Sequence, residues 1–294
     1  MLRFFRMLQR AFWRGFEHGC FNVAKAAAYS CILTFFPALM VLAAIVDMTG
    51  KGSAFATEVM HTLGVVLPPG AAGAARQYFE RKPVHEVRLL ISAVNIMLLA
   101  ASGVMISWMQ GFRGAYHLHN PWGFWKERGI ALGLVLLSIV PMTGSALLVG
   151  FGHQVEHWMM SNTIAEWHPL VYIIWTLSRW SVALLTSVMV IASIYYFGVP
   201  RVQRWYEVLP GALVATGMWA VATSVFGWYV KNYATYNVLY GSLGAGIALL
   251  VWMYITSVIV VVGAEFNAMV LSSGQPFATG FFNVDEFERE LQVR

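Results

Sequence analysis

Residues 89–108 read LLISAVNIMLLAASGVMISW, a stretch of twenty residues without a charged side chain. An α-helix rises about 1.5 Å per residue, so a helix of this length crosses the roughly 30 Å hydrocarbon core of a bilayer. Hydrocarbon contains no water that could bond to the backbone, whereas a helix satisfies its own backbone groups. The stretch therefore predicts a transmembrane helix.

Five further apolar stretches have the length of a spanning helix, and only one of them contains a charge, Arg179. Of all residues, 59% are hydrophobic and 11% are charged, whereas soluble domains carry about 25% charged residues. The composition excludes a water-soluble domain of this length. The sequence thus predicts an all-α, polytopic integral membrane protein with six transmembrane helices, at about 26–46, 89–108, 129–151, 170–197, 208–230 and 240–264.

Lysine and arginine residues outside these spans are more numerous on the side that carries the two ends of the chain. The positive-inside rule then places both termini in the cytoplasm. Since the basic residues lie between apolar stretches, the net charge of +5 indicates membrane topology and no nucleic-acid partner. We expect an external segment at 47–88 within a membrane domain at 26–268, and a polar cytoplasmic tail at 269–294.

The first 25 residues form a basic amphipathic segment. At 100° per residue, one arc of a helix carries four arginines, and the opposite face is apolar. Such a helix lies flat on an anionic leaflet, so membrane lipids are the expected partners; the alternative is a solvated basic tail. The two faces consist of Arg3, Arg6, Arg10 and Arg14, and of Phe5, Leu8, Phe12 and Phe16.

Arg179 is the first candidate for a functional residue, because a charge inside a span is costly and usually faces a partner, a cavity or the interface. If the helix begins near Leu170, Arg179 lies about 13 Å below the surface, where it could pair with an anionic ligand group. If the helix begins near Thr176, the side chain only extends to the interface.

Other polar residues within or next to the spans are candidates for a substrate path or for structural pairing. Glu265 follows the uncharged part of the last span, where proton coupling and structural pairing are both open. Pro37 removes a backbone donor from the first span, and polar side chains precede it, so this helix could line a cavity. The remaining candidates are Tyr29, Ser30 and Thr34 in the first span and Asn95 in the second.

Small residues recur along the last span, where they permit a close approach of helices. Helix packing is the expected role of this stripe and of the residues that begin the last two spans. The set comprises Pro210, Gly211, Tyr240, Gly241, Gly244 and Ala248. The sequence leaves open whether the chain forms a homo-oligomer.

His153, Glu156 and His157 match the pattern H-x-x-E-H, in which two imidazoles one helical turn apart can hold zinc. The match lies at the outer end of the third span, and no soluble catalytic domain surrounds it. We therefore predict no metal site and no cofactor, and we do not expect an enzyme.

Several short motifs together are similar to those of the BrkB/YihY family of bacterial inner-membrane proteins, over about residues 25–268. The resemblance implies a six-helix, multi-pass inner-membrane protein linked to envelope integrity and serum resistance, with a suspected role in transport. Members also carried an older ribonuclease label, which the residues do not support. The motifs are Ala28–Ser30, Phe35–Pro37, Leu209–Ala212, Tyr240–Gly244, Trp252 and Gly263–Asn267.

The leading hypothesis is a transporter or lipid-translocating protein for an amphipathic or anionic envelope component. It rests on Arg179, the first span with its proline, the basic N-terminal segment and the family's association with the envelope. The alternative is a membrane scaffold that supports envelope integrity without transport. A membrane-bound, metal-dependent hydrolase is the third hypothesis and depends on the H-x-x-E-H match alone.

Overall fold

The computed structural model describes residues 2–48, 87–161, 168–232 and 242–272, and these ranges form helices and no strand. Six of the helices are long and apolar enough to cross a membrane. The prediction of an all-α fold with six membrane helices is therefore confirmed. The helices are α1 (Leu2–Glu17), α2 (Cys20–Met48), α5 (Val87–Ala115), α6 (Phe124–Ser161), α7 (His168–Gly198), α8 (Trp205–Asn232) and α10 (Ser242–Ser272).

The helices extend beyond the expected spans. The last candidate membrane segment runs from Gly246 to Ser272, past the expected end at 264. The polar side chains of Glu265 and Asn267 do not end it, because both are bonded to other parts of the protein. Residues 49–86 of the expected external segment and 273–294 of the expected tail lie outside the described residues.

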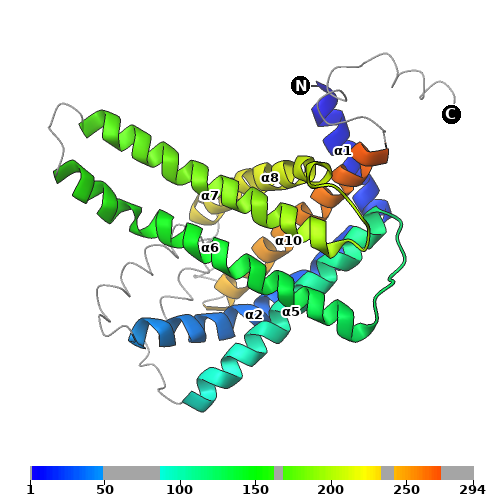
Figure 1. Cartoon of the computed structure of the whole chain (residues 1–294), viewed down its shortest axis with the longest axis horizontal. Coiled ribbons are helices and arrows are strands. Elements are labelled where there is room, and N and C mark those ends of the chain that lie inside the picture. Colours follow the sequence, from blue (N-terminus) through cyan, green and yellow to red (C-terminus); the bar gives the residue numbers. More distant parts are fainter. Residues whose placement is uncertain (1, 49–86, 162–167, 233–241, 273–294) are drawn as a thin grey trace.

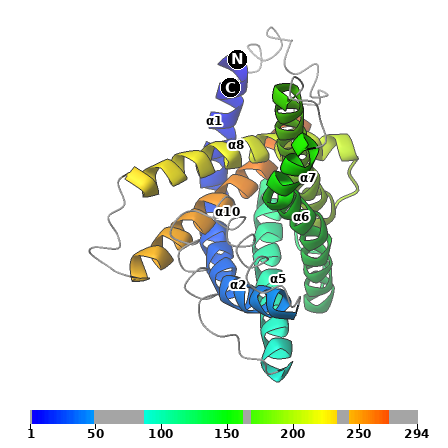
Figure 2. The same ribbon diagram turned by 90° about the vertical axis from the view of Figure 1, so that its left-hand side faces the viewer.

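Helix α10 is the central element of the bundle. In its most apolar part 61% of the residues are buried, against 17–39% in the other five candidate spans. It contacts α8, α2, α1 and α5, and Figures 1 and 2 show it running between α8 and α2. Val262 and Phe266 of α10 are fully buried in one cluster with Ala11 of α1 and Ala24 of α2.

The outer helices are arranged as two pairs. Helix α2 packs along α5, and α6 packs along α7; in Figure 1 the two pairs extend from the bundle in different directions. Large apolar side chains on α6 and α7 are exposed, for example Val140, Ile173 and Leu185. A water-soluble protein rarely exposes so much apolar surface, whereas lipid covers it readily.

The contact between α8 and α10 is close enough to exclude side chains. A Cβ atom on Gly211 would collide with the carbonyl oxygen of Gly263, and Pro210 beside it is buried. Asn267 is fully buried at this contact; its Oδ1 accepts a hydrogen bond from the Gly211 N–H (2.6 Å), and its Nδ2 donates one to the Val208 carbonyl (3.1 Å). The amide side chain thus fixes α10 against the first turns of α8.

The N-terminal helix contacts α10 through small residues. Ala11 is fully buried, and a Cβ atom on Gly15 would lie 3.7 Å from Val262. The aromatic residues expected on the apolar face, Phe5, Phe12 and Phe16, remain exposed. Their exposure leaves an apolar surface for lipid, and the interfacial position of α1 stays a prediction.

Candidate functional site

Glu265 is the buried acidic residue of the central helix, with 1% of its surface exposed. His18 Nδ1 lies 2.7 Å from Glu265 Oε1, and the Cys20 thiol donates to the same oxygen over 3.6 Å. Both partners flank Gly19, whose φ of +71° lies in the left-handed region that glycine adopts without strain. The turn between α1 and α2 therefore positions His18 over the carboxyl group.

A polar cavity of about 600 Å³ opens beside His18, at the end of the bundle where α1, α5 and α10 meet. We call it the polar cavity. Arg201, which follows α7, also lines it, so four parts of the chain contribute side chains to the cavity. Its lining consists of Arg14, Glu17, His18, Ala115, Tyr116, His117, Arg201, Ala268, Leu271 and Ser272.

His117 follows the end of α5 with a φ of 52°, a conformation that residues other than glycine rarely adopt. Two hydrogen bonds hold the turn: the Leu118 N–H donates to the Arg113 carbonyl, and the His117 N–H donates to the Gly114 carbonyl. This pattern is the Schellman motif, in which the left-handed position is usually glycine. The His117 ring meets the His18 ring edge-on, with centroids 4.8 Å apart.

Three further polar residues lie at this end of the bundle. Burial raises the pKa of the Tyr116 phenol, so it is a neutral hydrogen-bonding group of the cavity wall at ordinary pH. Arg113 and Glu127 lie 2.7 Å apart and join the end of α5 to the start of α6. The ion pair thus links the two ends of the connection between α5 and α6, which carries Tyr116 and His117 of the cavity wall.

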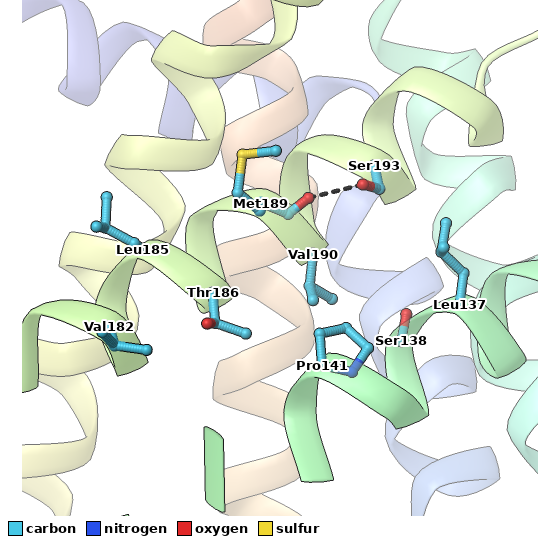
Figure 3. Close-up of a pocket in the computed structure, with 9 residues that line it drawn as sticks. All are labelled: Leu137, Ser138, Pro141, Val182, Leu185, Thr186, Met189, Val190 and Ser193. Carbon is cyan, nitrogen blue, oxygen red and sulfur yellow. Dashed lines mark hydrogen bonds between the residues drawn. The ribbon is translucent and has the colours of Figure 1, made fainter. Parts of the chain in front are cut away.

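A second hollow, the α6–α7 groove, lies between two membrane helices and has a volume of about 310 Å³ (Figure 3). Its wall is mainly apolar. The hydroxyls of Ser138 and Ser193 donate to carbonyls of their own helices, over 2.7 and 2.8 Å. Pro141 lies inside α6 at the groove, where it offers no backbone N–H for a helical hydrogen bond. The lining residues are Leu137, Ser138, Pro141, Val182, Leu185, Thr186, Met189, Val190 and Ser193.

Arg179 lies on the same helix contact as the groove, further toward the start of α7. Its side chain packs on Gly152 of α6, where a Cβ atom would lie 2.5 Å from Arg179 Cδ, and the Trp175 indole donates to the Gly152 carbonyl (2.8 Å). Helix α7 begins at His168, so Arg179 lies about 16 Å along it. Its Nε is buried and has no hydrogen bond within the described residues.

The polar candidates of the first span line neither of the two hollows described above. Thr34 Oγ1 donates to the Ser30 carbonyl (2.8 Å), and the Ser30 hydroxyl packs against Gly103 of α5. Tyr29 is 64% exposed on the surface of the helix. Pro37 is inside α2, as the sequence indicates.

Of the remaining candidates, Asn95 and Ala248 have described surroundings. Asn95 is exposed and donates to the Ile91 carbonyl of its own helix (2.8 Å). Ala248 is buried with Phe35, Phe226 and Trp252. Tyr240 and Gly241 lie outside the described residues, and Gly244 belongs to α10 without a described environment.

The H-x-x-E-H residues all belong to α6. Glu156 is buried and engaged in an interaction, while the surroundings of His153 and His157 lie outside what the structure describes. Among the described residues, no group of three His, Cys, Asp or Glu side chains is placed to hold a metal ion.

Sequence reasoning missed the residues that surround Glu265 and the groove. His18 and Glu265 are 247 positions apart, and no local pattern joins them. Pro141 carried the same signal as Pro37, a proline within an apolar span, and this signal could have directed attention to α6. Arg201 and His117 follow the ends of helices, where basic residues normally indicate topology.

Comparison with known proteins gives one family match and a set of distant relatives. Residues 11–277 match the family described as virulence factor BrkB. The chain is 23% identical over 264 residues to the ribonuclease-like protein YfkH of Bacillus subtilis, covering 90% of this chain and 94% of the relative.

Two further relatives carry the name UPF0761 membrane protein. The relative from Tolumonas auensis is 26% identical over 274 residues, covering 90% of this chain and 85% of its own length. The relative from Chlorobium luteolum is 27% identical over 267 residues, covering 89% and 60%. No solved structure matches the chain.

Proposed function

Because this chain belongs to the virulence factor BrkB family of membrane proteins, we propose a function within the bilayer: translocation of an anionic, amphipathic lipid between the leaflets. The chain is a multi-pass membrane protein, as its bacterial relatives are named. The ribonuclease-like name is that of the Bacillus subtilis relative. For a metal-dependent cleavage of RNA, the described residues offer no metal-binding group of three.

The α6–α7 groove is the observation that carries the proposal. It lies within the apolar segments of both helices, so the molecules that reach it in a membrane are lipids. The two serine hydroxyls of the wall are bonded within their own helices and demand no partner from a ligand. An acyl chain therefore fits against these two hydroxyls without leaving them unsatisfied.

The position of Arg179 supports an anionic lipid as the proposed substrate. Gly152, which it contacts, lies eleven residues beyond Pro141 on α6, about 16 Å along the helix. A cation in this apolar segment is costly unless it meets an anion or water. A phosphate group accepts the paired hydrogen bonds that a guanidinium donates, and it would relieve this cost. Groove and arginine together match a lipid with an apolar tail and an anionic head group.

Translocation is measured with the purified chain in liposomes of phosphatidylcholine and phosphatidylglycerol that contain a trace of fluorescent phosphatidylglycerol. Dithionite bleaches the outer leaflet at once and inner-leaflet label only after translocation. We expect the wild-type chain to expose inner-leaflet label. A phenylalanine at Thr186 fills the groove, so Thr186→Phe lowers the rate about tenfold, which corresponds to about 1.4 kcal/mol in the barrier.

Leu177→Phe is the matched control, because Leu177 lies on the same helix with 67% of its surface exposed to lipid. This variant keeps the wild-type rate. Arg179→Gln slows phosphatidylglycerol more than fluorescent phosphatidylcholine, and Arg179→Lys retains most of the activity because it keeps the charge. Equal rates for wild type, Thr186→Phe and protein-free liposomes would refute translocation through the groove.

A further inference from the structure

The polar cavity is separate from the α6–α7 groove, and the two share no lining residue. It lies at the end of the bundle that carries α1, and its wall comes from α1, the end of α5, the α7–α8 connection and α10. Four basic side chains from three of these parts line it: Arg14, His18, His117 and Arg201. One acidic side chain, Glu17, shares the lining.

Within the described ranges, no ion pair joins Arg14 or Arg201 to an acidic residue. The nearby carboxyl group of Glu265 is buried behind His18 and is bonded to it over 2.7 Å. Guanidinium groups that line a cavity without an ion pair to a carboxylate are typical of sites for phosphate or carboxylate ligands.

The histidine at the cavity wall is held there at a conformational cost. The left-handed conformation of His117 is strained for a residue with a Cβ atom, whereas glycine adopts it without strain at a Schellman motif. The fold instead places an imidazole next to the ring of His18, on the cavity wall. Strained backbone of this kind concentrates at ligand-binding sites.

We infer that the polar cavity binds a phosphate-bearing anion, through Arg14 and Arg201 with the imidazoles of His18 and His117 as further hydrogen-bonding groups. The phosphate belongs to a phospholipid head group or to a soluble phosphate ester, since both present the same oxygens. The site does not depend on translocation, because it shares no residue with the groove. It gives the end of the bundle near α1 a binding function of its own.

Binding is measured with the full chain in nanodiscs of phosphatidylcholine, which adds no anionic lipid. Glycerol phosphate, titrated by calorimetry, probes the soluble source. Phosphatidylglycerol, added to the nanodisc and detected on the released protein by native mass spectrometry, probes the lipid source. We expect at least one of the two probes to bind. Arg14→Gln and Arg201→Gln each weaken that binding about tenfold, or about 1.4 kcal/mol.

Arg204→Gln is the matched control, because Arg204 is exposed three residues after Arg201 and bonds to the Tyr206 hydroxyl, outside the cavity lining. It leaves binding unchanged. Thr186→Phe also binds as wild type, so a failure of translocation and a failure of the anion site are told apart. Binding of neither probe to the wild-type chain, or equal weakening by Arg204→Gln, would overturn the inference. Arg14 and Arg201 are exposed, so their variants fold, which a melting curve verifies.

Discussion

The α8–α10 contact and the α6–α7 contact join neighbouring membrane helices in opposite ways. At the first, two glycines bring the backbones together, and Asn267 bonds to both an N–H and a carbonyl of α8. At the second, the helices leave a groove of about 310 Å³, and Arg179 Nε is buried without a hydrogen bond among the described residues.

The difference indicates which contact is built for stability. Lipid is as apolar as the helices, so membrane helices associate through close packing and hydrogen bonds. The α8–α10 contact has both. The α6–α7 contact lacks close packing along the groove, as functional sites often do at the expense of stability.

Gly211→Leu should give the largest effect, because the new side chain has no space between α8 and α10. We expect a loss of about 3 kcal/mol or more in the free energy of unfolding, measured by SDS titration in detergent micelles. Gly144→Leu on α6 is the control, since nothing lies within 4 Å of a Cβ atom there. Similar losses in both variants would remove the distinction between the two contacts.

Asn267→Leu should give the next largest effect. It removes the acceptor for the Gly211 N–H and the donor to the Val208 carbonyl, in a fully buried position. The expected loss is about 1–3 kcal/mol in the same titration. Asn95→Leu, whose amide bonds only within its own helix at the lipid surface, should lose less than about 0.5 kcal/mol. A neutral Asn267→Leu would mean that packing alone holds α8 to α10.

Arg179→Leu should have a smaller effect on stability than the two preceding variants. Its main effect should be on translocation. Removing a charge from an apolar segment offsets the lost packing on Gly152, so unfolding changes by at most about 1 kcal/mol. Translocation of phosphatidylglycerol falls in the liposome assay. A loss of stability as large as that of Asn267→Leu would assign Arg179 a structural role.

Thr186→Phe should have the smallest effect on stability. The α6–α7 groove has room for the ring, so the free energy of unfolding changes by less than about 0.5 kcal/mol. Ala215→Phe provides the contrast: Ala215 is fully buried on α8, and its Cβ lies 2.8 Å from where a Cβ on Gly263 would be. We expect Ala215→Phe to unfold far more readily. Comparable melting curves for the two variants would mean that the groove is closed in the folded protein.

The sequence predicted the membrane helices because lipid imposes a local requirement, about twenty apolar residues without charge. It also identified Gly211 and Glu265 within short motifs. It did not predict what these residues contact, because His18, Asn267 and Tyr195 meet their partners only when distant helices pack. Tyr195, for example, donates to the Val260 carbonyl of α10 over 2.7 Å.

The candidate sites were predicted less well, for a physical reason. Polarity in a span signals either a path or a bond within the helix, and the sequence does not distinguish the two. Thr34 and Asn95 bond to carbonyls of their own helices, whereas Arg179 packs across to α6. A groove has no sequence pattern of its own, because it arises from the spacing of two helices.

The central position of α10 has a consequence for biosynthesis. This helix is the last described segment to be translated, yet α1, α2, α5 and α8 all pack against it. The five earlier membrane helices therefore enter the bilayer before α10, against which three of them pack, has been made. Their association is completed only after synthesis of Ser272, when Glu265 reaches His18 and Asn267 reaches Gly211. A ribosome that stalls before α10 would release a chain in which α2, α5 and α8 lack the central helix that they pack against.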